Sequence, residues 1–200
     1  MKSFLIPLGK PSPLVESCEA FPVLVSTIIS LRTRDTVTEK ISSKVLKKAP
    51  DVESMLAIGQ NELELLLRPA GFYRQKAKQL KRIALILHRD YESRVPDNME
   101  SLQSLPGVGR KTANFVLGMV FGKPSICVDV HVHRISNRLG LVESKSPEET
   151  EFALQKLFPE AEWTGINHIM VRFGQRICKP VKPLCHECPL REPCPSGSQD

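Results

Sequence analysis

The chain of 200 residues has no hydrophobic run long enough to cross a membrane. Its longest mostly apolar stretch, Phe21 to Leu31, contains a proline and polar residues and falls well short of the roughly 20 residues of a transmembrane helix. The N-terminus also lacks the apolar region of a secretion signal, because Pro7 follows Lys2 after only a few apolar residues. We therefore expect an intracellular protein, cytoplasmic or (in a eukaryote) nuclear, with no membrane partner.

Strand-like alternation of apolar and polar residues is also scarce, and no internal repeat is evident. The one alternating segment, residues 126–133, could be a strand if read alone. Its residues Val128 and Val132, however, continue into Ile135 with the spacing of a helical stripe. We therefore predict an all-α protein in which Asp129 lies at or just before a helix N-terminus.

Helical patterns cover most of the remaining chain. Asp35 is a candidate N-cap, and Ser146 followed by Pro147 and Glu149 predicts a serine cap, a proline at the first helical position and a capping box. In the longest of these helices Leu80 and Ile83 mark the buried stripe, which would leave its lysines outward. The expected helices span residues 19–31, 35–48, 52–58, 62–67, 73–91, 99–104, 110–121 and 164–176.

The charge balance favours an anionic partner only weakly. Lysine and arginine exceed aspartate and glutamate by 28 to 22, which gives a net charge of +6 and a pI of about 9.1. A basic excess of this size suits nucleic acid, but many proteins are mildly basic without binding it.

The segment from Leu105 to Ala113 carries the first functional motif. A short helix should end at Pro106, and Gly107 and Gly109 permit a tight turn with exposed backbone amides before the next helix. Such amides, with the positive end of the helix dipole, suit a phosphate group. An ordinary helix–helix turn is the alternative.

Lys111 and Asp129 form the second candidate constellation. A lysine near the positive end of a helix and shielded from water has a lowered pKa, which exposes its nucleophilic amine. An aspartate can orient that amine, stabilise positive charge on a sugar or transfer a proton. The simpler alternatives are a solvated lysine and an aspartate that only caps a helix.

Four cysteines in the last 23 residues form the third. Cys178, Cys185, Cys188 and Cys194 indicate a metal site, because thiolates need a cation to share a small space. Their spacing leaves zinc and an iron–sulfur cluster equally open. We expect the two remaining cysteines to be inert core residues. The two are Cys18 and Cys127.

A second metal site can be drawn around residue 130. His131 and His133, together with Cys127, have side chains that bind metals. Histidines packed in a core or placed on the surface are the favoured alternative.

The three motifs together resemble the endonuclease III family of the helix-hairpin-helix DNA glycosylase superfamily, from about Phe21 to Cys194. The resemblance implies a two-lobed helical fold that binds DNA between its lobes. A six-helix lobe would span residues 19–124. A second lobe would combine residues 1–18 with residues 125–200, including a cluster loop at 178–194.

The resemblance also implies roles for single residues. Lys111 would be the Schiff-base nucleophile, Asp129 the catalytic carboxylate, and the four cysteines the ligands of a [4Fe-4S] cluster. Relatives with tyrosine in place of Lys111 resemble mismatch thymine glycosylases without lyase activity. Lysine therefore implies a bifunctional DNA glycosylase and abasic-site lyase, acting as a monomer on oxidised pyrimidines in duplex DNA and cleaving 3′ to the abasic site by β-elimination.

Some positions depart from the family pattern. Many relatives have a glutamine that fills the gap left by the flipped nucleotide, and here Arg32 or Leu31 must serve instead. Gln103 replaces a frequent glutamate. Phe72 matches an apolar wedge residue, which suits the opening of a base stack.

Further DNA contacts are expected around these positions. Five basic residues lie between positions 74 and 82, and we expect Arg74 and Lys78 to contact phosphates near the lesion. The remaining candidates are the turn residues and one histidine. They are Pro106, Gly107, Val108, Gly109, Arg110 and His131.

Two other functions fit the same motifs. One is a monofunctional glycosylase for uracil or mismatched thymine. The other is a non-catalytic DNA-binding module in which the hairpin contacts phosphates and zinc holds the C-terminal tail.

Overall fold

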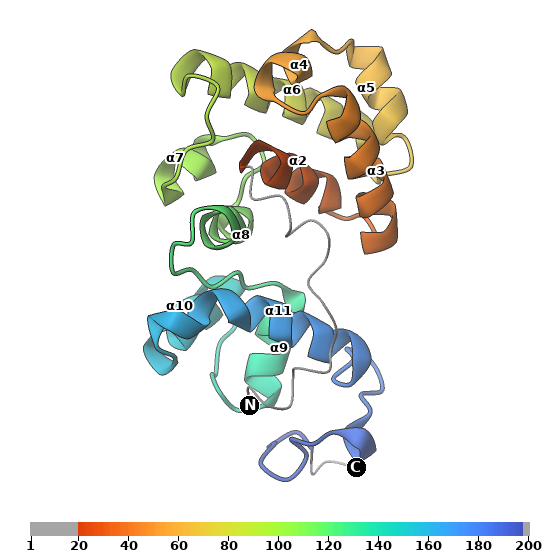
Figure 1. Cartoon of the computed structure of the whole chain (residues 1–200). Helices are drawn as coiled ribbons and strands as arrows, with labels where there is room; N and C mark the ends of the chain where they lie inside the picture. Colours follow the sequence, from red (N-terminus) through yellow and green to blue (C-terminus); the bar gives the residue numbers. More distant parts are fainter. Residues whose placement is uncertain (1–19, 198–200) are drawn as a thin grey trace. The chain divides into compact units, whose positions relative to one another are not determined.

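The computed structural model describes residues 20–197, and every regular element in this range is helical (Figure 1). The absence of strands from the described part confirms the all-α prediction and excludes the strand alternative at residues 126–133. Within the same range, no helix combines the length and apolar character that a membrane span needs.

The described helices divide by their contacts into two compact units, residues 20–122 and residues 123–197. We call them the hairpin unit and the cysteine unit. The division falls two residues before the predicted boundary at residue 124. The predicted contribution of residues 1–18 to the second lobe, and the core position expected for Cys18, lie outside the described residues.

The described part of the hairpin unit holds seven helices, one more than the six-helix bundle implied by the resemblance. Their bounds match the expected helices to within two residues. They are α2 (Ala20–Ser30), α3 (Asp35–Lys48), α4 (Val52–Ala57), α5 (Gln60–Leu67), α6 (Tyr73–Asp90), α7 (Met99–Ser104) and α8 (Arg110–Val120).

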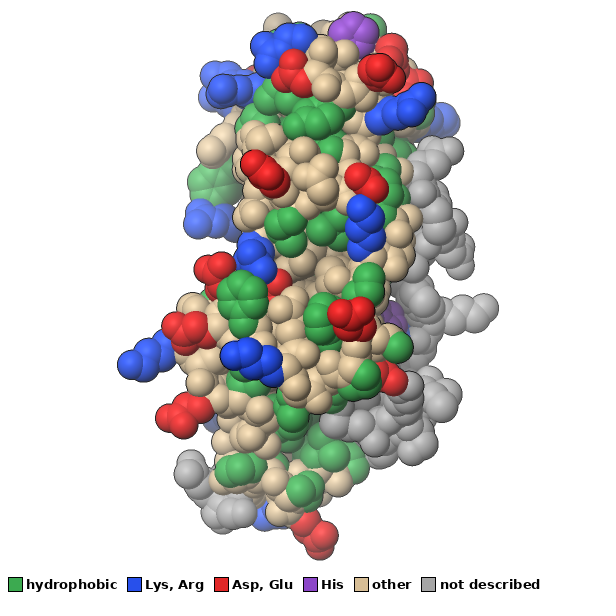
Figure 2. Space-filling model, turned by 90° about the vertical axis from the view of Figure 1, so that its left-hand side faces the viewer, with side chains coloured by type: hydrophobic (Ala, Val, Ile, Leu, Met, Phe, Trp, Pro, Cys, Tyr) green, Lys and Arg blue, Asp and Glu red, His purple; other side chains and the backbone are tan. Residues whose placement is uncertain are grey.

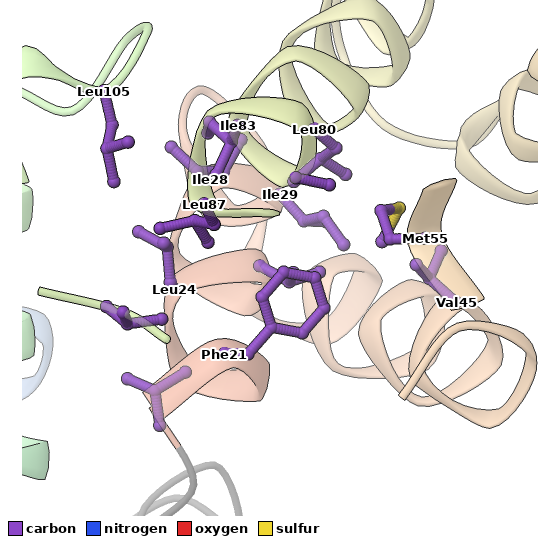
Figure 3. Close-up of a cluster of buried hydrophobic side chains, with 14 of the residues drawn as sticks. Phe21, Leu24, Ile28, Ile29, Val45, Met55, Leu80, Ile83, Leu87 and Leu105 are labelled. Atoms are coloured by element: carbon purple, nitrogen blue, oxygen red, sulfur yellow. The ribbon is translucent and has the colours of Figure 1, made fainter. Parts of the chain in front are cut away.

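Helix α2 is the centre of this unit, and it packs against α3, α6 and α8. Its residues are apolar on most sides, which is why Leu24 and Ile28 are fully buried. Helix α6 is amphipathic and turns Leu80 and Leu87 toward the same core (Figure 3). Burial of each such side chain stabilises the unit by about 1.5–3 kcal/mol.

Side chains that were not identified from the sequence cap two helices of this unit, and the expected cap at Asp35 is wrong. The Asp51 carboxylate accepts the Ser54 amide at 2.7 Å, and the Asn98 side chain accepts the Ser101 amide at 2.9 Å. Asp35 is the first residue of α3 and not its cap, because Arg34 holds the extended position before the helix. In the first turn, the negative charge of Asp35 still interacts favourably with the positive end of the helix dipole.

The cysteine unit contains α9 (Val130–Arg138), α10 (Pro147–Leu157), α11 (Glu160–Arg176) and a short 3-10 helix (Cys185–Glu187). Helix α9 packs against α11 and α10. The unit has a core of its own, because its buried apolar residues form a cluster separate from that of the hairpin unit. Each unit therefore carries the apolar burial that stabilises it.

The start of α10 confirms the predicted serine cap. The Ser146 hydroxyl accepts the Glu149 amide at 3.2 Å, and Pro147 is the first helical residue. The Glu149 carboxylate accepts the amide of Lys145, one residue earlier than a standard capping box. Helix α11 begins four residues before the predicted start at residue 164.

Two lysines of α6 contradict the prediction that its lysines point outward. Lys76 is only 4% exposed, and its ammonium donates to the Ile29 carbonyl oxygen and to the Thr33 hydroxyl, each at 2.7 Å. Lys81 donates to the carbonyl oxygens of Leu56, at 2.8 Å, and Ile58. A long aliphatic stem lets a lysine lie along apolar surface while its ammonium reaches helix-end carbonyls that lack a partner.

Candidate active site and cysteine centre

The segment between α7 and α8 is a tight turn. The Val108 amide donates to the Leu105 carbonyl oxygen at 3.1 Å, and Gly107 has a φ of +71°. Proline at the second position and a positive φ at the third are the pattern of a type II turn, in which the third residue is normally glycine. The predicted hairpin turn between two helices is therefore present, with Pro106 and Gly107 in the roles that the sequence indicated.

A side chain of helix α6 holds this turn in place. The Gln79 side-chain amide donates to the Pro106 carbonyl oxygen at 2.7 Å. A Cβ atom on Gly107 would collide with that same amide group of Gln79. Gly107 is therefore required both for its backbone conformation and for its close contact with α6, and sequence reasoning did not identify Gln79.

Gly109 serves a different purpose. It precedes α8 with a φ of −86° and a ψ of 176°, which any residue can adopt, and a Cβ atom there would meet nothing within 4 Å. It supplies no side-chain cap to the helix. Because Gly109 has no side chain, no Cβ atom stands in the way of an anion that approaches the first amides of α8.

Lys111 and Asp129 lie in different units. Lys111 is the second residue of α8 and is exposed. Asp129 caps α9: its Oδ1 accepts the amides of His131 at 2.8 Å and Val132 at 2.9 Å, and neither of these bonds uses Oδ2. The position expected for Asp129 before a helix is confirmed, whereas its pairing with Lys111 stays a prediction.

Arg32 and Phe72 lie together within the hairpin unit. The Arg32 guanidinium lies 5.4 Å from the centre of the Phe72 ring. Both residues have positive φ, 54° and 58°, which is uncommon for residues other than glycine and costs about 1–3 kcal/mol each. Phe72 is 59% exposed, while Leu31 is half-buried against the core. Of the two gap-filling candidates, Arg32 is thus the one that faces the proposed wedge residue.

Three of the five basic residues of α6 are exposed, namely Arg74, Lys78 and Arg82. Arg74 lies 3.9 Å from a carboxylate oxygen of Glu64 and covers the ring of Tyr73 at 5.6 Å. On the face drawn in Figure 2, acidic and basic side chains of the described residues are interspersed and form no patch of one sign. A DNA contact through α6 would use these three exposed positions.

The histidines around residue 130 make hydrogen bonds that hold the cysteine unit together. His131 Nδ1 lies 3.0 Å from an Arg134 guanidinium nitrogen, and His133 Nδ1 lies 2.6 Å from the Thr150 hydroxyl. Cys127 is buried, as expected. Between residues 20 and 197 no three side chains of the metal-binding types are grouped closely enough to hold one ion. The geometry therefore does not support a metal site around His131.

The four C-terminal cysteines line one cavity of about 330 Å³. Apolar and polar side chains complete its wall, among them Phe173, Ile177 and Arg138. Four thiol donors around one cavity are a donor set that a metal centre can use, and sites built only of thiolates hold zinc or an iron–sulfur cluster.

Arginines of α9 fasten the cysteine-bearing segment. Arg134 donates to the Cys178 carbonyl oxygen at 2.8 Å, and Arg138 donates to the Lys179 carbonyl oxygen at 2.6 Å and lies 3.5 Å from the Cys178 sulfur. Burial raises the pKa of the Cys188 thiol, and the charges of the three neighbouring cysteines raise it further. Four thiolates at this place would repel one another unless a cation compensated their charge.

Comparison with known proteins shows the relationship directly. Residues 25–160 match the family model of the HhH-GPD superfamily base excision DNA repair proteins. The chain is 52% identical over 176 residues to endonuclease III of Thermotoga maritima, a match that covers 88% of this chain and 83% of that protein. It spans a smaller part of a chloroplast homologue from Arabidopsis thaliana and of a bovine homologue, 49% and 59% of their lengths.

Solved structures show the same fold. A trapped endonuclease III–DNA covalent intermediate superposes with a TM-score of 0.85 at 37% identity, covering 90% of this chain and 84% of that one. A thermostable thymine-DNA glycosylase superposes with a TM-score of 0.89 at 27% identity, covering 99% and 93%. With a family match over most of its length and relatives of this identity, the chain belongs to the endonuclease III family of the HhH-GPD superfamily.

Proposed function

We propose that this protein is a bifunctional DNA glycosylase and abasic-site lyase that removes oxidised pyrimidines from duplex DNA. The observation that carries the proposal is the place of Lys111, exposed in the first turn of α8 directly after the tight turn of the hairpin. Family relatives named endonuclease III, one of them trapped covalently on DNA, support it. Activity and covalent trapping on duplexes that each carry one defined lesion would test it.

The chemistry assigned to Lys111 is nucleophilic. Its amine attacks C1′ of the damaged nucleotide, and the bonding pair of the glycosidic bond leaves with the base. Opening of the sugar gives an imine between Lys111 and C1′. Loss of a proton from C2′ then expels the 3′ phosphate by β-elimination, and hydrolysis of the imine returns the amine.

Asp129 supplies charge in this scheme. Its carboxylate, held at the start of α9 by two amide bonds, stabilises positive charge on the sugar or accepts a proton. A cap that fixes one carboxylate oxygen also fixes the direction of the other. Its structural and catalytic roles are therefore compatible.

The turn after α7 binds the DNA backbone in this proposal. The backbone amides around Gly109 and Arg110 donate to a phosphate, and Pro106, Gly107 and Val108 shape the turn. Arg32 and Phe72 occupy the opened base step, while His131 lies near the catalytic carboxylate. Arg74 and Lys78 add phosphate contacts outside it.

Cys178, Cys185, Cys188 and Cys194 hold a [4Fe-4S] cluster in the same proposal. The cavity that the four cysteines share and its four thiol donors support this assignment. When bound, the cluster supplies metal–thiolate bonds that stabilise the fold of the segment.

A monofunctional thymine or uracil glycosylase is the second candidate, because a thymine-DNA glycosylase has the same fold. The two differ in chemistry at one side chain. Only an amine such as that of Lys111 forms an imine that borohydride can reduce onto the protein. Trapping on a lesion duplex therefore separates them.

We expect Lys111→Gln to abolish borohydride trapping and base release while DNA affinity stays within a few-fold. The amide of glutamine cannot attack C1′, but the exposed position tolerates it without loss of packing. Trapping yield and gel-shift affinity on the same duplex are the measurements. Trapping near the wild-type yield would remove Lys111 from the role of nucleophile.

Asp129→Asn should lower the single-turnover rate of base release by at least about 10²-fold, the usual scale for a positioned charged group. The asparagine oxygen can still accept the amides of His131 and Val132, so the melting temperature should hardly change. If the rate is unchanged as well, Asp129 is only a helix cap.

The two hairpin glycines should separate stability from binding. Gly107→Ala should lower the free energy of unfolding by about 1–2 kcal/mol or more, because alanine is strained at positive φ and would displace Gln79. Gly109→Ala should leave stability unchanged but weaken DNA affinity, because its methyl group blocks the approach of a phosphate. Denaturant unfolding and DNA titration of both variants are the measurements; unchanged affinity in Gly109→Ala would argue against a phosphate at this turn.

The purified protein should be yellow-brown, absorb near ~400 nm and contain iron, as expected for a cluster held by four cysteines. Cys185→Ala should reduce the iron content and loosen the cysteine unit, because metal binding contributes to folding free energy. Stoichiometric zinc without iron would replace the cluster assignment by a zinc site.

A further inference from the structure

Lys76 is a buried cation whose role the catalytic scheme does not use. Its ammonium is enclosed beneath the turn that joins α2 to α3, and both of its acceptors, the Ile29 carbonyl and the Thr33 hydroxyl, are uncharged. Burial lowers the pKa of Lys76 to about 8. An apolar side chain of similar length would fill the same space without this cost, so packing alone does not explain a lysine here.

The two acceptors lie on either side of one turn. Helix α2 ends at Ser30, whose carbonyl accepts the Thr33 amide at 3.0 Å, and Arg32 lies at the tip of this turn with a φ of 54°. Lys76 therefore bridges the residue before the turn to the residue after it. A positive charge also suits this place, since carbonyl groups converge at a helix C-terminus.

Lys76 also makes a backbone hydrogen bond to Phe72, the residue whose ring Arg32 covers. Its own backbone amide donates to the Phe72 carbonyl oxygen at 3.0 Å, in the first turn of α6. One residue thus holds the Arg32 turn through its side chain and the Phe72 backbone through its main chain. The approach is close, because a Cβ atom on Gly71 would lie 3.0 Å from the Arg32 carbonyl oxygen.

We propose that Lys76 is a positioning residue that holds Arg32 across the ring of Phe72 and thereby sets which base opposite the lesion is accepted. This inference rests on the proposed function, since it needs Arg32 and Phe72 to act at the opened base step. Without the two hydrogen bonds of the Lys76 ammonium, the strained turn can relax and Arg32 loses its fixed position.

Lys81 provides a matched control on the same helix. Its ammonium donates to two backbone carbonyls at the end of α4, where no DNA contact is proposed, whereas that of Lys76 donates to one carbonyl and one hydroxyl. Lys76→Met and Lys81→Met therefore each remove an ammonium that donates at a helix end, at two different turns. Thr33→Val is a milder variant that keeps the buried lysine in case Lys76→Met does not fold. It removes one acceptor of Lys76 and also the bond from the Thr33 hydroxyl to the Leu31 carbonyl at 3.4 Å.

The first measurement is hydrogen exchange of backbone amides, which needs no activity. Lys76→Met and Thr33→Val should speed exchange of the backbone amide of residue 33. Lys81→Met should speed exchange around Ile58 and leave the amide of residue 33 protected. Equal protection of Thr33 in all variants would show that Lys76 does not hold the turn and would overturn the proposal.

The second measurement is the single-turnover rate of base release from four duplexes that differ only in the base opposite the lesion. Lys76→Met should change the ratio of these rates by roughly twofold or more, and the double variant with Arg32→Ala should change it no further than Arg32→Ala alone. Lys81→Met should keep the wild-type ratio. A uniform loss on all four duplexes, or additive effects in the double variant, would contradict a role through Arg32.

Failure of the proposed function gives a different pattern. If the wild-type protein releases no base from any lesion duplex, the proposed function falls, and the opposite-base part of this inference falls with it. If the wild-type protein is active and Arg32→Ala alters the ratio but Lys76→Met does not, only the inference about Lys76 is overturned.

Discussion

Backbone carbonyl groups at the ends of helices need hydrogen-bond donors, and in the hairpin unit helix α6 supplies them. Its side chains at Lys76 and Lys81 donate to carbonyls in the last turns of α2 and α4, and Gln79 donates to the Pro106 carbonyl after α7. A buried carbonyl without a donor costs about 1–3 kcal/mol of folding free energy. Each of these bonds therefore satisfies a carbonyl and also holds a turn in place. The turns proposed to meet DNA are thus fixed by one helix.

The strained backbone of this unit is found where α6 can hold it. Arg32 and Gly107 have positive φ and lie at turns bonded to α6, and Phe72, which also has positive φ, is the residue just before α6. For residues other than glycine such conformations are strained and persist only where surrounding bonds determine them. A rigid helix that follows the proposed wedge residue and anchors the hairpin can keep the spacing between the two constant, which would suit a DNA duplex of fixed geometry.

In the cysteine unit, side chains of one helix also hold a segment that lies outside the helices. Helix α9 begins at the Asp129 cap and carries arginines that donate to carbonyls of the cysteine segment. These bonds order a segment that has little helix of its own. One short helix therefore fixes the candidate carboxylate at its N-cap and the cysteine-lined cavity at its last turns.

By itself the sequence determined the helices, the caps at Asp129 and Ser146, the hairpin and the grouping of four cysteines near the C-terminus. These depend on short-range spacing: apolar residues every three or four positions, Ser146 before Pro147, and glycines next to Pro106. Tertiary structure alone decided the direction of Lys76 and Lys81, the contact of Arg32 with Phe72, and the role of Gln79. Each of these joins residues at least 23 positions apart, and a charged residue in a helical pattern looks solvated until the packing of a neighbouring helix end presents it with an acceptor.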